Sequence, residues 1–295
     1  MIICKVDINA AFRRGTLSSD TAAESLTIFD NMLRMALSMT FGGAPCPSLW
    51  GVISETLADI TNMIPQNPHW DHLSLYDEIS DSLEPPLSLP ESTPFHPGKE
   101  MVVPTQMNDQ GYFDIYIDDT IGVTPDLHNY PLRMCRATPL AIRTLARPLN
   151  TNDIIPEKDI IATKKYQVEG RLEEQKMILG WILNTRSLEI SLPPNKHEKW
   201  TKEILRLISI PKVRGKHLEY ILGSLNHVAN IYNPMRHFLG RIYQALYRAN
   251  SSKGWTSLKT TEIVDFHTIM LFLDSAKKGI SMNNLTFRNH THLPV

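Results

Sequence analysis

Cysteine is scarce in this sequence and long apolar runs are missing, and each absence excludes a class of protein. Of the 295 residues only three are cysteine, namely Cys4, Cys46 and Cys135. An odd number at such wide spacing excludes a disulfide framework and the paired spacing of a zinc site. No run of about 18 apolar residues is present, so we expect no transmembrane helix and no membrane partner.

A secretory signal is also missing, because the N-terminus lacks a basic start, an apolar stretch and a small-residue cleavage site. Together with the few, widely spaced cysteines, this predicts an intracellular protein of the cytoplasm or nucleus that is not secreted. Hydrophobic residues make up 42% of the chain and charged residues 21%, which is typical of a globular protein and not of a disordered one.

The net charge of −1 hides an uneven distribution along the chain. Residues 1–195 contain 15 Lys and Arg against 25 Asp and Glu, whereas residues 196–295 contain 15 against 6. An acidic part suited to metal ions and a basic part suited to phosphates fit a protein that binds nucleic acid; chance asymmetry between two solvated surfaces is the alternative. The basic residues expected to contact a nucleic-acid backbone are Lys212, Arg214, Lys216, Arg236 and Arg241.

The stretch Tyr116–Asp119 places two adjacent carboxylates between two short runs rich in β-branched and aromatic residues. Such runs predict two strands, and therefore a hairpin that presents Asp118 and Asp119 at its turn. Two ionised carboxylates at one turn repel each other unless a cation is bound, and Mg²⁺ is usually held by one or two carboxylates plus substrate phosphates. The alternative is a solvated turn, because Asp is a common turn residue.

Two segments nearer the N-terminus carry the other distinctive residues. Asp7 lies in an apolar, strand-like run, where a carboxylate is costly to bury unless it is paired or bound to a metal; an edge-strand aspartate facing water is the alternative. The paired glycines and spaced prolines of Phe41–Pro47 predict a rigid turn with room for a ligand. A helix is predicted directly afterwards, over residues 48–63, with Ser48 as its N-cap.

In this order the segments resemble the motifs of a reverse transcriptase, in the form found in LTR- or DIRS-type retrotransposons. Two later stretches are similar to the fourth motif and to the primer-grip hairpin of these enzymes. The resemblance spans roughly residues 1 to 290. The matching segments are Asp7 with Phe12, Phe41–Pro47, Tyr116–Asp119, Gly170–Lys176 and Ile178–Leu183.

This resemblance implies an RNA-directed DNA polymerase that transfers nucleotides from dNTPs to a primer 3′-hydroxyl on an RNA or DNA template. Two Mg²⁺ ions, or Mn²⁺, would stabilise the attacking and leaving oxygens. Asp7, Asp118 and Asp119 would be catalytic metal ligands, and Lys176 would protonate the leaving pyrophosphate. A solvated lysine at a helix end is the alternative for Lys176.

The resemblance also implies which residues contact the substrates. Phe12 would stack under the incoming sugar and favour deoxynucleotides, and Arg13 would reach the triphosphate. From the residues alone, Phe12 and Trp181 serve equally well as core aromatics, and Arg13 as a surface arginine. The implied substrate contacts are Phe12, Arg13, Phe41, Gly42, Pro47 and Tyr116, and the implied primer grip is Leu179, Gly180 and Trp181.

The predicted fold is α+β. Residues 1–195 are expected to form a polymerase palm, with an antiparallel sheet backed by helices, and residues 196–295 a mostly helical thumb and connection region. Eight of the 20 prolines fall within residues 65–112, which predicts a long loop inserted in the palm. Helical periodicity predicts a helix at about 132–146 and four helices after residue 196.

Relative to the family, the chain is expected to be truncated before the fingers region and before a ribonuclease H domain. One alternative function is therefore a truncated retroelement remnant that binds nucleic acid without turnover. A nuclease that uses two metal ions is a further alternative, and it would account for the carboxylates. It would not account for the joint presence of Phe12 and the glycine-proline turn.

Overall fold

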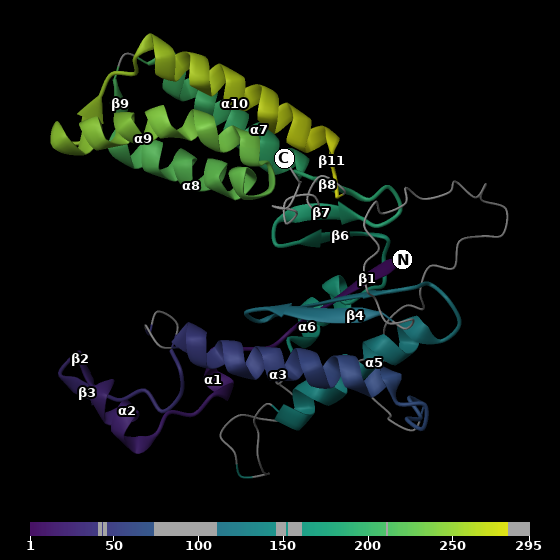
Figure 1. Ribbon diagram of the computed structural model, residues 1–295. Helices are drawn as coiled ribbons and strands as arrows, with labels where there is room; N and C mark the ends of the chain where they lie inside the picture. Colours follow the sequence, from purple (N-terminus) through teal and green to yellow (C-terminus); the bar gives the residue numbers. More distant parts are fainter. Residues whose placement is uncertain are drawn as a thin grey trace, which may run out of the picture. The chain divides into compact units, whose positions relative to one another are not determined.

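The computed structural model describes residues 1–40, 43, 46–73, 111–145, 152, 161–210 and 212–282. In this part of the chain helices and small sheets are mixed and all paired strands are antiparallel, as the α+β prediction requires. The described residues divide into two compact units, one up to Glu174 and one from Gln175 (Figure 1). No helix among the described residues is long and apolar enough to cross a membrane.

The first unit contains a three-stranded antiparallel sheet in the order β1-β5-β4. Its strands are β1 (Ile2–Asp7), β4 (Tyr112–Tyr116) and β5 (Asp119–Thr124). Buried and half-buried residues alternate along β5, as the pleat of a strand covered on one face requires. Asp119 pairs with Asp7 on one side and with Tyr116 on the other, so the acidic ends of the strands meet at one edge.

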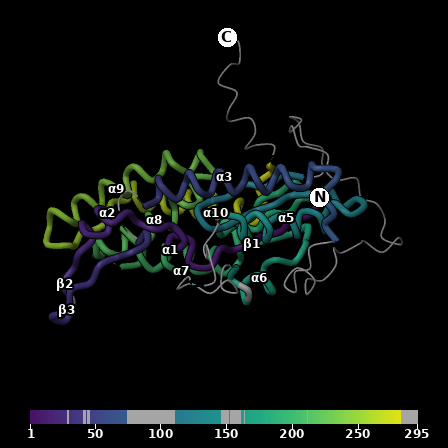
Figure 2. Tube along the Cα trace, turned by 90° about the horizontal axis from the view of Figure 1, so that it is seen from below, coloured from purple at the N-terminus to yellow at the C-terminus, as the bar shows by residue number. Residues whose placement is uncertain are grey.

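Two long helices cover one face of this sheet. They are α3 (Cys46–Gln66) and α5 (Tyr130–Leu145), which pack against each other while α3 contacts β4 and α5 contacts β5 (Figure 1). The β2–β3 hairpin projects away from the sheet (Figure 2). The shorter elements are α1 (Ala11–Arg14), α2 (Ser19–Glu24), β2 (Thr27–Phe29), β3 (Met32–Arg34) and α6 (Thr163–Glu169).

The outer edge of β1 is closed by the segment that surrounds α6. The backbones of Ile3 and Glu173 exchange two hydrogen bonds of 2.8 and 3.2 Å, and the N–H of Ala162 donates to the carbonyl of Asp7 at 3.1 Å. β1 is therefore hydrogen-bonded along both edges, although it is an outermost strand of the three-stranded sheet. This enclosure explains why Asp7 is only 6% exposed.

The second unit combines a four-stranded antiparallel sheet, in the order β11-β8-β7-β6, with four helices. Its strands are β6 (Gln175–Ile178), β7 (Trp181–Asn184), β8 (Glu189–Ser191) and β11 (Ile280–Ser281). Its helices are α7 (Pro194–Ser209), α8 (Gly215–Ile231), α9 (Arg236–Ser251) and α10 (Thr260–Lys278). A short 3₁₀ helix, η2 (Asn233–Met235), precedes α9, and β9 (Val213–Arg214) pairs with β10 (Trp255–Thr256).

One hydrophobic core serves both the sheet and the helices of this unit. Trp181 and Leu192 from the sheet segment pack in the same cluster as Trp200 and Leu225 from the helices. The compact units therefore divide after Glu174.

The helix after the glycine-proline turn starts earlier than expected. It begins at Cys46 and includes Pro47, which the first turn of a helix tolerates because its N–H has no intrahelical partner there. Ser48 therefore lies inside α3, and the prediction that it caps the helix is wrong. Of the turn itself, Phe41 and Gly42 lie outside the described residues, as do residues 74–110 of the proline-rich insertion.

Candidate active site

The two adjacent aspartates lie at a tight hairpin of the first unit. Only Ile117 and Asp118 join β4 to β5, since Tyr116 pairs directly with Asp119. Ile117 has a φ of 60°, a left-handed conformation that a β-branched residue rarely adopts. Two-residue hairpins favour positive φ at their first turn position because it matches the twist of the strands. The hairpin therefore presents Asp118 on a strained turn.

Trp50 of α3 anchors this turn. Its side chain is 2% exposed, and its Nε1–H donates a hydrogen bond of 2.5 Å to the carbonyl of Ile117. The Trp50 ring also packs against Phe12, with 5.9 Å between ring centroids. One buried side chain thus connects a helix, the aspartate turn and the aromatic residue of the first predicted motif.

The backbone brings the three predicted acidic residues to one edge of the sheet. Asp7 lies directly opposite Asp119 on the neighbouring strand, and the N–H of Ile8 donates to the carbonyl of Asp118 at 3.3 Å. Residues directly opposite on antiparallel strands have Cβ atoms about 4.5–5.5 Å apart. Carboxylates more than a hundred positions apart in the sequence are therefore neighbours in space.

The charges of this cluster are only partly compensated. Burial raises the pKa of Asp118, and the negative charges of Asp7 and Asp119 raise it further. Oδ1 of Asp7 is buried and has no hydrogen-bond partner among the described residues. A buried carboxylate oxygen without a partner, beside a second carboxylate, is a site that a cation stabilises.

Two lysines approach the cluster, and each neutralises one carboxylate. Nζ of Lys165 in α6 lies 2.5 Å from Oδ2 of Asp7. Nζ of Lys5 in β1 lies 3.1 Å from Oδ1 of Asp119 and 2.8 Å from Oε2 of Glu169. The Lys165 side chain is 58% exposed, whereas that of Lys5 is 13% exposed. The first lysine is thus a surface group, and the second is built into the sheet.

Both lysines are held in the charged form. The hydrogen bond to Asp7 raises the pKa of Lys165. Burial alone would lower the pKa of Lys5, but the hydrogen bonds to Glu169 and Asp119 outweigh burial and raise it. Asp7 and Asp119 therefore each have a positively charged partner, whereas Asp118 has no ion pair within the described residues.

These ion pairs affect how the cluster would hold a metal ion. Within the described ranges, no group of three or more His, Cys, Asp or Glu side chains is arranged to hold one. Two carboxylates on neighbouring segments still suit a divalent cation, since Asp7 has an orphaned oxygen and Asp118 has no ion pair within the described residues. The residues present therefore fit Mg²⁺ at Asp7 and Asp118 better than at Asp119, which Lys5 occupies.

A cavity of about 500 Å³ lies beside the end of β1. Of the predicted substrate residues, Phe12 and Arg13 line it, together with Asn9, Ser38, Met39 and Thr40. Arg13 is exposed, whereas the neighbouring Arg14 is buried and its Nε–H donates to the carbonyl of Asn9 at 3.0 Å. Phe12 packs in the core and also forms a wall of the cavity, so the prediction of a core aromatic is confirmed and its contact with a sugar stays a prediction.

Two other predicted substrate residues are described but do not line this cavity. Tyr116 ends β4 with its side chain 57% exposed, and Pro47 is exposed in the first turn of α3. Asp114, also on β4, is exposed and its Oδ1 accepts a hydrogen bond of 2.8 Å from the N–H of Ile115.

The predicted primer-grip residues belong to the second unit. Leu179 and Gly180 form the two-residue turn between β6 and β7, with φ of 48° and 81°. Nζ of Lys196 donates to the carbonyl of Gly180 at 3.0 Å. Trp181 is 4% exposed and stacks on His227 with 5.4 Å between ring centroids. Leu179 is thus the exposed tip of the hairpin, and Trp181 anchors it in the core.

Lys176, the predicted general acid, lies in β6 and is 6% exposed. The alternative interpretation as a solvated lysine at a helix end is therefore wrong.

Two of the arginines that were expected to contact a nucleic-acid backbone form contacts within the second unit. Nε of Arg241 lies 2.6 Å from Oδ2 of Asp265, a residue only 1% exposed, and Arg236 donates to the carbonyl of Ala229 at 3.2 Å. These two arginines therefore connect helices of the second unit. Arg214 instead lies over the ring of Trp255, 4.8 Å from its centroid.

Sequence reasoning missed the residues that support the cluster. Lys165 and Glu169 belong to a short helix without apolar periodicity, and nothing local in the sequence connects them to Asp7. Lys5 carried a weak signal, because it precedes Asp7 by two positions and residues two apart on a strand share a face. Trp50 could be recognised only as a core aromatic.

Comparison with known proteins shows a likeness in fold. No protein-family model and no curated protein matches the sequence. The chain is similar to a foamy viral protease-reverse transcriptase solved in complex with an RNA/DNA hybrid, with a TM-score of 0.56 and 12% identity over 95% of the chain. Two further structures, both foamy viral protease-reverse transcriptases with double-stranded DNA, give TM-scores of 0.54 at 11% and 12% identity.

The chain covers 28%, 36% and 42% of those three chains, which is less than half of each. At such identities the likeness concerns the fold alone. The chain therefore has a reverse-transcriptase-like fold.

Proposed function

We propose that this chain is the palm and thumb part of an RNA-directed DNA polymerase from an LTR- or DIRS-type retroelement. The observation that supports this most directly is the meeting of Asp7 with the Asp118–Asp119 turn in a reverse-transcriptase-like fold. In this proposal the first unit contains the palm, and the helices of the second unit form the thumb. The reaction is transfer of a nucleotide from a dNTP to a primer 3′-hydroxyl.

Asp7 and Asp118 would hold Mg²⁺, or Mn²⁺, which when bound stabilises the attacking and leaving oxygens. Lys165 has a flexible, exposed side chain and would release Asp7 when the cation binds. Lys5 would stay in place, because it is buried and paired with both Asp119 and Glu169. Asp119 would then orient the turn through Lys5 and add negative charge beside Asp118.

The dNTP would enter the cavity that Phe12 and Arg13 line. The Arg13 guanidinium suits the triphosphate, and the Phe12 ring, fixed against Trp50, would leave no room for a 2′-hydroxyl. Lys176 would protonate the leaving pyrophosphate. The exposed tip at Leu179 and Gly180 would contact the primer, with Trp181 as its anchor.

The partners in this proposal are a primer and an RNA or DNA template. The similar foamy viral structures hold an RNA/DNA hybrid or double-stranded DNA, which supports a nucleic-acid partner for this chain as well.

Primer extension on an RNA template tests the proposal. With Mg²⁺ and dNTPs the chain should extend the primer, and Asp118→Asn should abolish extension while the fold is kept. Asp114→Asn is the matched control, because it removes an exposed carboxylate from the same hairpin. Extension that survives in Asp118→Asn would contradict the assignment.

A second candidate is a remnant that binds nucleic acid without turnover. The ion pairs of Lys165 with Asp7 and of Lys5 with Asp119 favour it, because they already neutralise two of the carboxylates. This candidate predicts template binding that is unchanged by Asp118→Asn, and no incorporation with either Mg²⁺ or Mn²⁺.

A further inference from the structure

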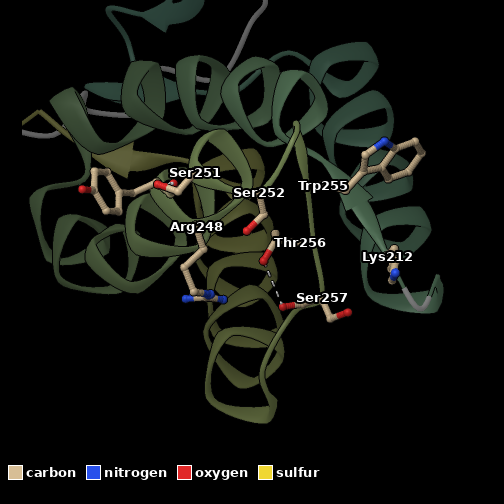
Figure 3. A pocket seen from close by; sticks show the side chains of 8 residues that line it. Lys212, Arg248, Ser251, Ser252, Trp255, Thr256 and Ser257 are labelled. Atoms are coloured by element: carbon tan, nitrogen blue, oxygen red, sulfur yellow. Dashed lines mark hydrogen bonds between the residues drawn. The ribbon is translucent and has the colours of Figure 1, made fainter.

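A second cavity lies in the second unit, where the C-terminal end of α9 meets the β9–β10 pair (Figure 3). Its volume is about 480 Å³, and we refer to it as the α9 pocket. Its lining contains basic, hydroxyl and aromatic side chains but no carboxylate. The residues that matter here are Lys212, Tyr247, Arg248, Ser252, Trp255 and Ser257.

The α9 pocket lies in a positively charged part of the chain. Residues 236–261 contain five Lys and Arg and no Asp or Glu, and residues 204–218 contain four and none. Arg248 has one partner, since its Nη2 lies 2.8 Å from Glu262. Lys212 is exposed and has no ion pair within the described residues. The pocket thus keeps at least one cation available for an anionic ligand.

Hydroxyl groups lie near Arg248, whereas Lys212 lies on the other side of the pocket (Figure 3). Figure 3 shows Arg248, Ser252, Thr256 and Ser257 close together in the middle of the pocket. Ser251 is engaged, because its Oγ donates to the carbonyl of Tyr247 at 3.1 Å. The hydroxyls of Ser252 and Ser257 have no hydrogen-bond partner among the described residues and can donate to phosphate oxygens.

Two aromatic rings border the pocket and are exposed, which is unusual for such large side chains. Tyr247 is 76% exposed and Trp255 is 44% exposed. The Arg214 guanidinium lies over the Trp255 ring, 4.8 Å from its centroid, so a ligand has access only to the remaining surface of the indole. Exposed rings beside cations are the combination on which unpaired bases stack in single-strand sites.

We propose that the α9 pocket binds an unpaired nucleic-acid strand. Lys212, Arg248 and the serine hydroxyls hold a phosphate, and a base packs against Trp255. An unpaired strand fits better than a duplex, because the faces of paired bases are covered by their neighbours. The inference shares a nucleic-acid partner with the proposed function, but it involves none of the carboxylates of the first unit.

Binding of two labelled strands to the full chain tests this inference. One strand is a short oligothymidylate, and the other has the same length and backbone but lacks bases. Lys212→Gln should weaken binding of both and reduce the slope of log affinity against log salt by about 0.7. Trp255→Leu should weaken only the strand that has bases, by about tenfold.

Lys202→Gln is the matched control, because it removes the same charge from an exposed position on α7. Equal affinities of the Lys212→Gln and Lys202→Gln variants would overturn the inference. So would full displacement of the strand by inorganic phosphate with no effect of Trp255→Leu, since that result describes a site for small anions. Lys212→Glu is a second test of the phosphate contact, because Lys212 is exposed and charge reversal should weaken binding of both strands more than Lys212→Gln does.

Asp118→Asn separates this inference from the proposed function. That variant should bind oligothymidylate like the unmodified chain even where it extends no primer. If Lys212→Gln loses strand binding, the inference about the α9 pocket is supported. If the unmodified chain in the same experiments shows no polymerase activity, the proposed function is refuted while that inference stands.

Discussion

At the residue scale, Trp50 and Ile117 form the contact on which the aspartate turn depends. A non-glycine residue with positive φ costs on the order of 1–3 kcal/mol and persists only where its surroundings fix it. The Trp50 indole supplies such a contact through its hydrogen bond to the Ile117 carbonyl. The same indole packs against Phe12, so its two functions can be separated by mutation.

Trp50→Phe should keep the packing and lose the hydrogen bond. We expect about 1 kcal/mol less stability, since the carbonyl of Ile117 loses its donor, and a severalfold lower rate of primer extension. Urea unfolding and single-nucleotide incorporation measure the two effects. Trp200→Phe, at a buried position of the second unit, is the control and should leave incorporation unchanged. An unaltered incorporation rate in Trp50→Phe would show that the turn needs no anchor.

Asp118 should make the folded state less stable than it would otherwise be. The pKa of Asp118 in the folded state is raised above the ordinary value, so protonation favours the folded state. Ionisation of Asp118 therefore lowers the stability once the pH exceeds the pKa of an ordinary aspartate. Asp118→Asn should therefore raise the melting temperature at neutral pH, and the gain should shrink as the pH falls toward about 4. Asp114→Asn should show no such gain, and a lower melting temperature of Asp118→Asn at neutral pH would be the contrary result.

Individual residues of the site were predictable only in part. Asp7, Asp118 and Asp119 follow from motifs whose order along the chain implies that they meet. The lysine partners depend on cross-strand register and on a helix more than 150 positions away, neither of which a local pattern specifies.

At the element scale, α9 and α10 are joined by ion pairs whose acidic partners are buried. Asp265 and Glu262 of α10 are 1% and 2% exposed, and Arg241 and Arg248 of α9 neutralise them. A buried carboxylate that loses its positively charged partner strongly lowers the stability of the folded protein, whereas an exposed ion pair contributes little to that stability.

Arg241→Met should therefore destabilise the second unit clearly, because Asp265 is left buried and unpaired. The double variant Arg241→Met, Asp265→Leu should recover most of that loss. Arg206→Met is the control: its pair with Glu203 lies on the surface of α7, so we expect about 0.5 kcal/mol or less. Urea unfolding measures all three, and equal losses for Arg241→Met and Arg206→Met would contradict the burial argument.

The β6–β7 hairpin should make stability depend on pH through His227. Burial lowers the pKa of His227, and the charge of Lys196 lowers it further. The unfolded state therefore binds the proton more readily, so stability is complete above the ordinary pKa of 6.5 and decreases as the pH falls below it. His227→Gln should flatten this dependence in urea unfolding, whereas the exposed His267→Gln should not. An unchanged slope in His227→Gln would refute the assignment.

Elements with a regular pattern were predictable and irregular ones were not. The β4–β5 hairpin and the four helices after residue 196 show their pattern in the sequence, and they are present. The β6–β7 hairpin is also present, but it was expected only from the resemblance to the primer-grip motif. The β2–β3 hairpin and α6 are short and lack an apolar stripe, so no local signal announces them. The start of α3 was misplaced because Pro47 looked like part of the turn, although the first turn of a helix accepts proline.

At the scale of the whole molecule, the excess of basic residues after residue 195 divides into arginines that pair with acidic side chains and lysines that form no such pair within the described residues. Four of the six acidic residues after residue 195 pair with an arginine or histidine, namely Glu203, Glu262, Asp265 and Asp274. Several of the arginines there therefore stabilise the unit itself. The lysines without such partners remain the source of any attraction to phosphates.

Binding of a primer and template to the full chain should accordingly depend on salt. If about four lysines each neutralise a phosphate, the slope of log affinity against log salt should be about −3.6 for a duplex. Fluorescence anisotropy over a series of salt concentrations measures this slope. Affinity that does not change with salt would show that the basic part of the chain contacts no nucleic acid.

The closed outer edge of β1 has a consequence for the order of events during translation. Asp7 leaves the ribosome before its strand partners at 119–124 and its edge partners at 162 and 173, which are synthesised much later. Contacts of such long sequence separation form slowly, because a large loop must close first. β1 is thus synthesised well before the segments that pair with it, and a nascent chain arrested before α6 would leave its outer edge exposed.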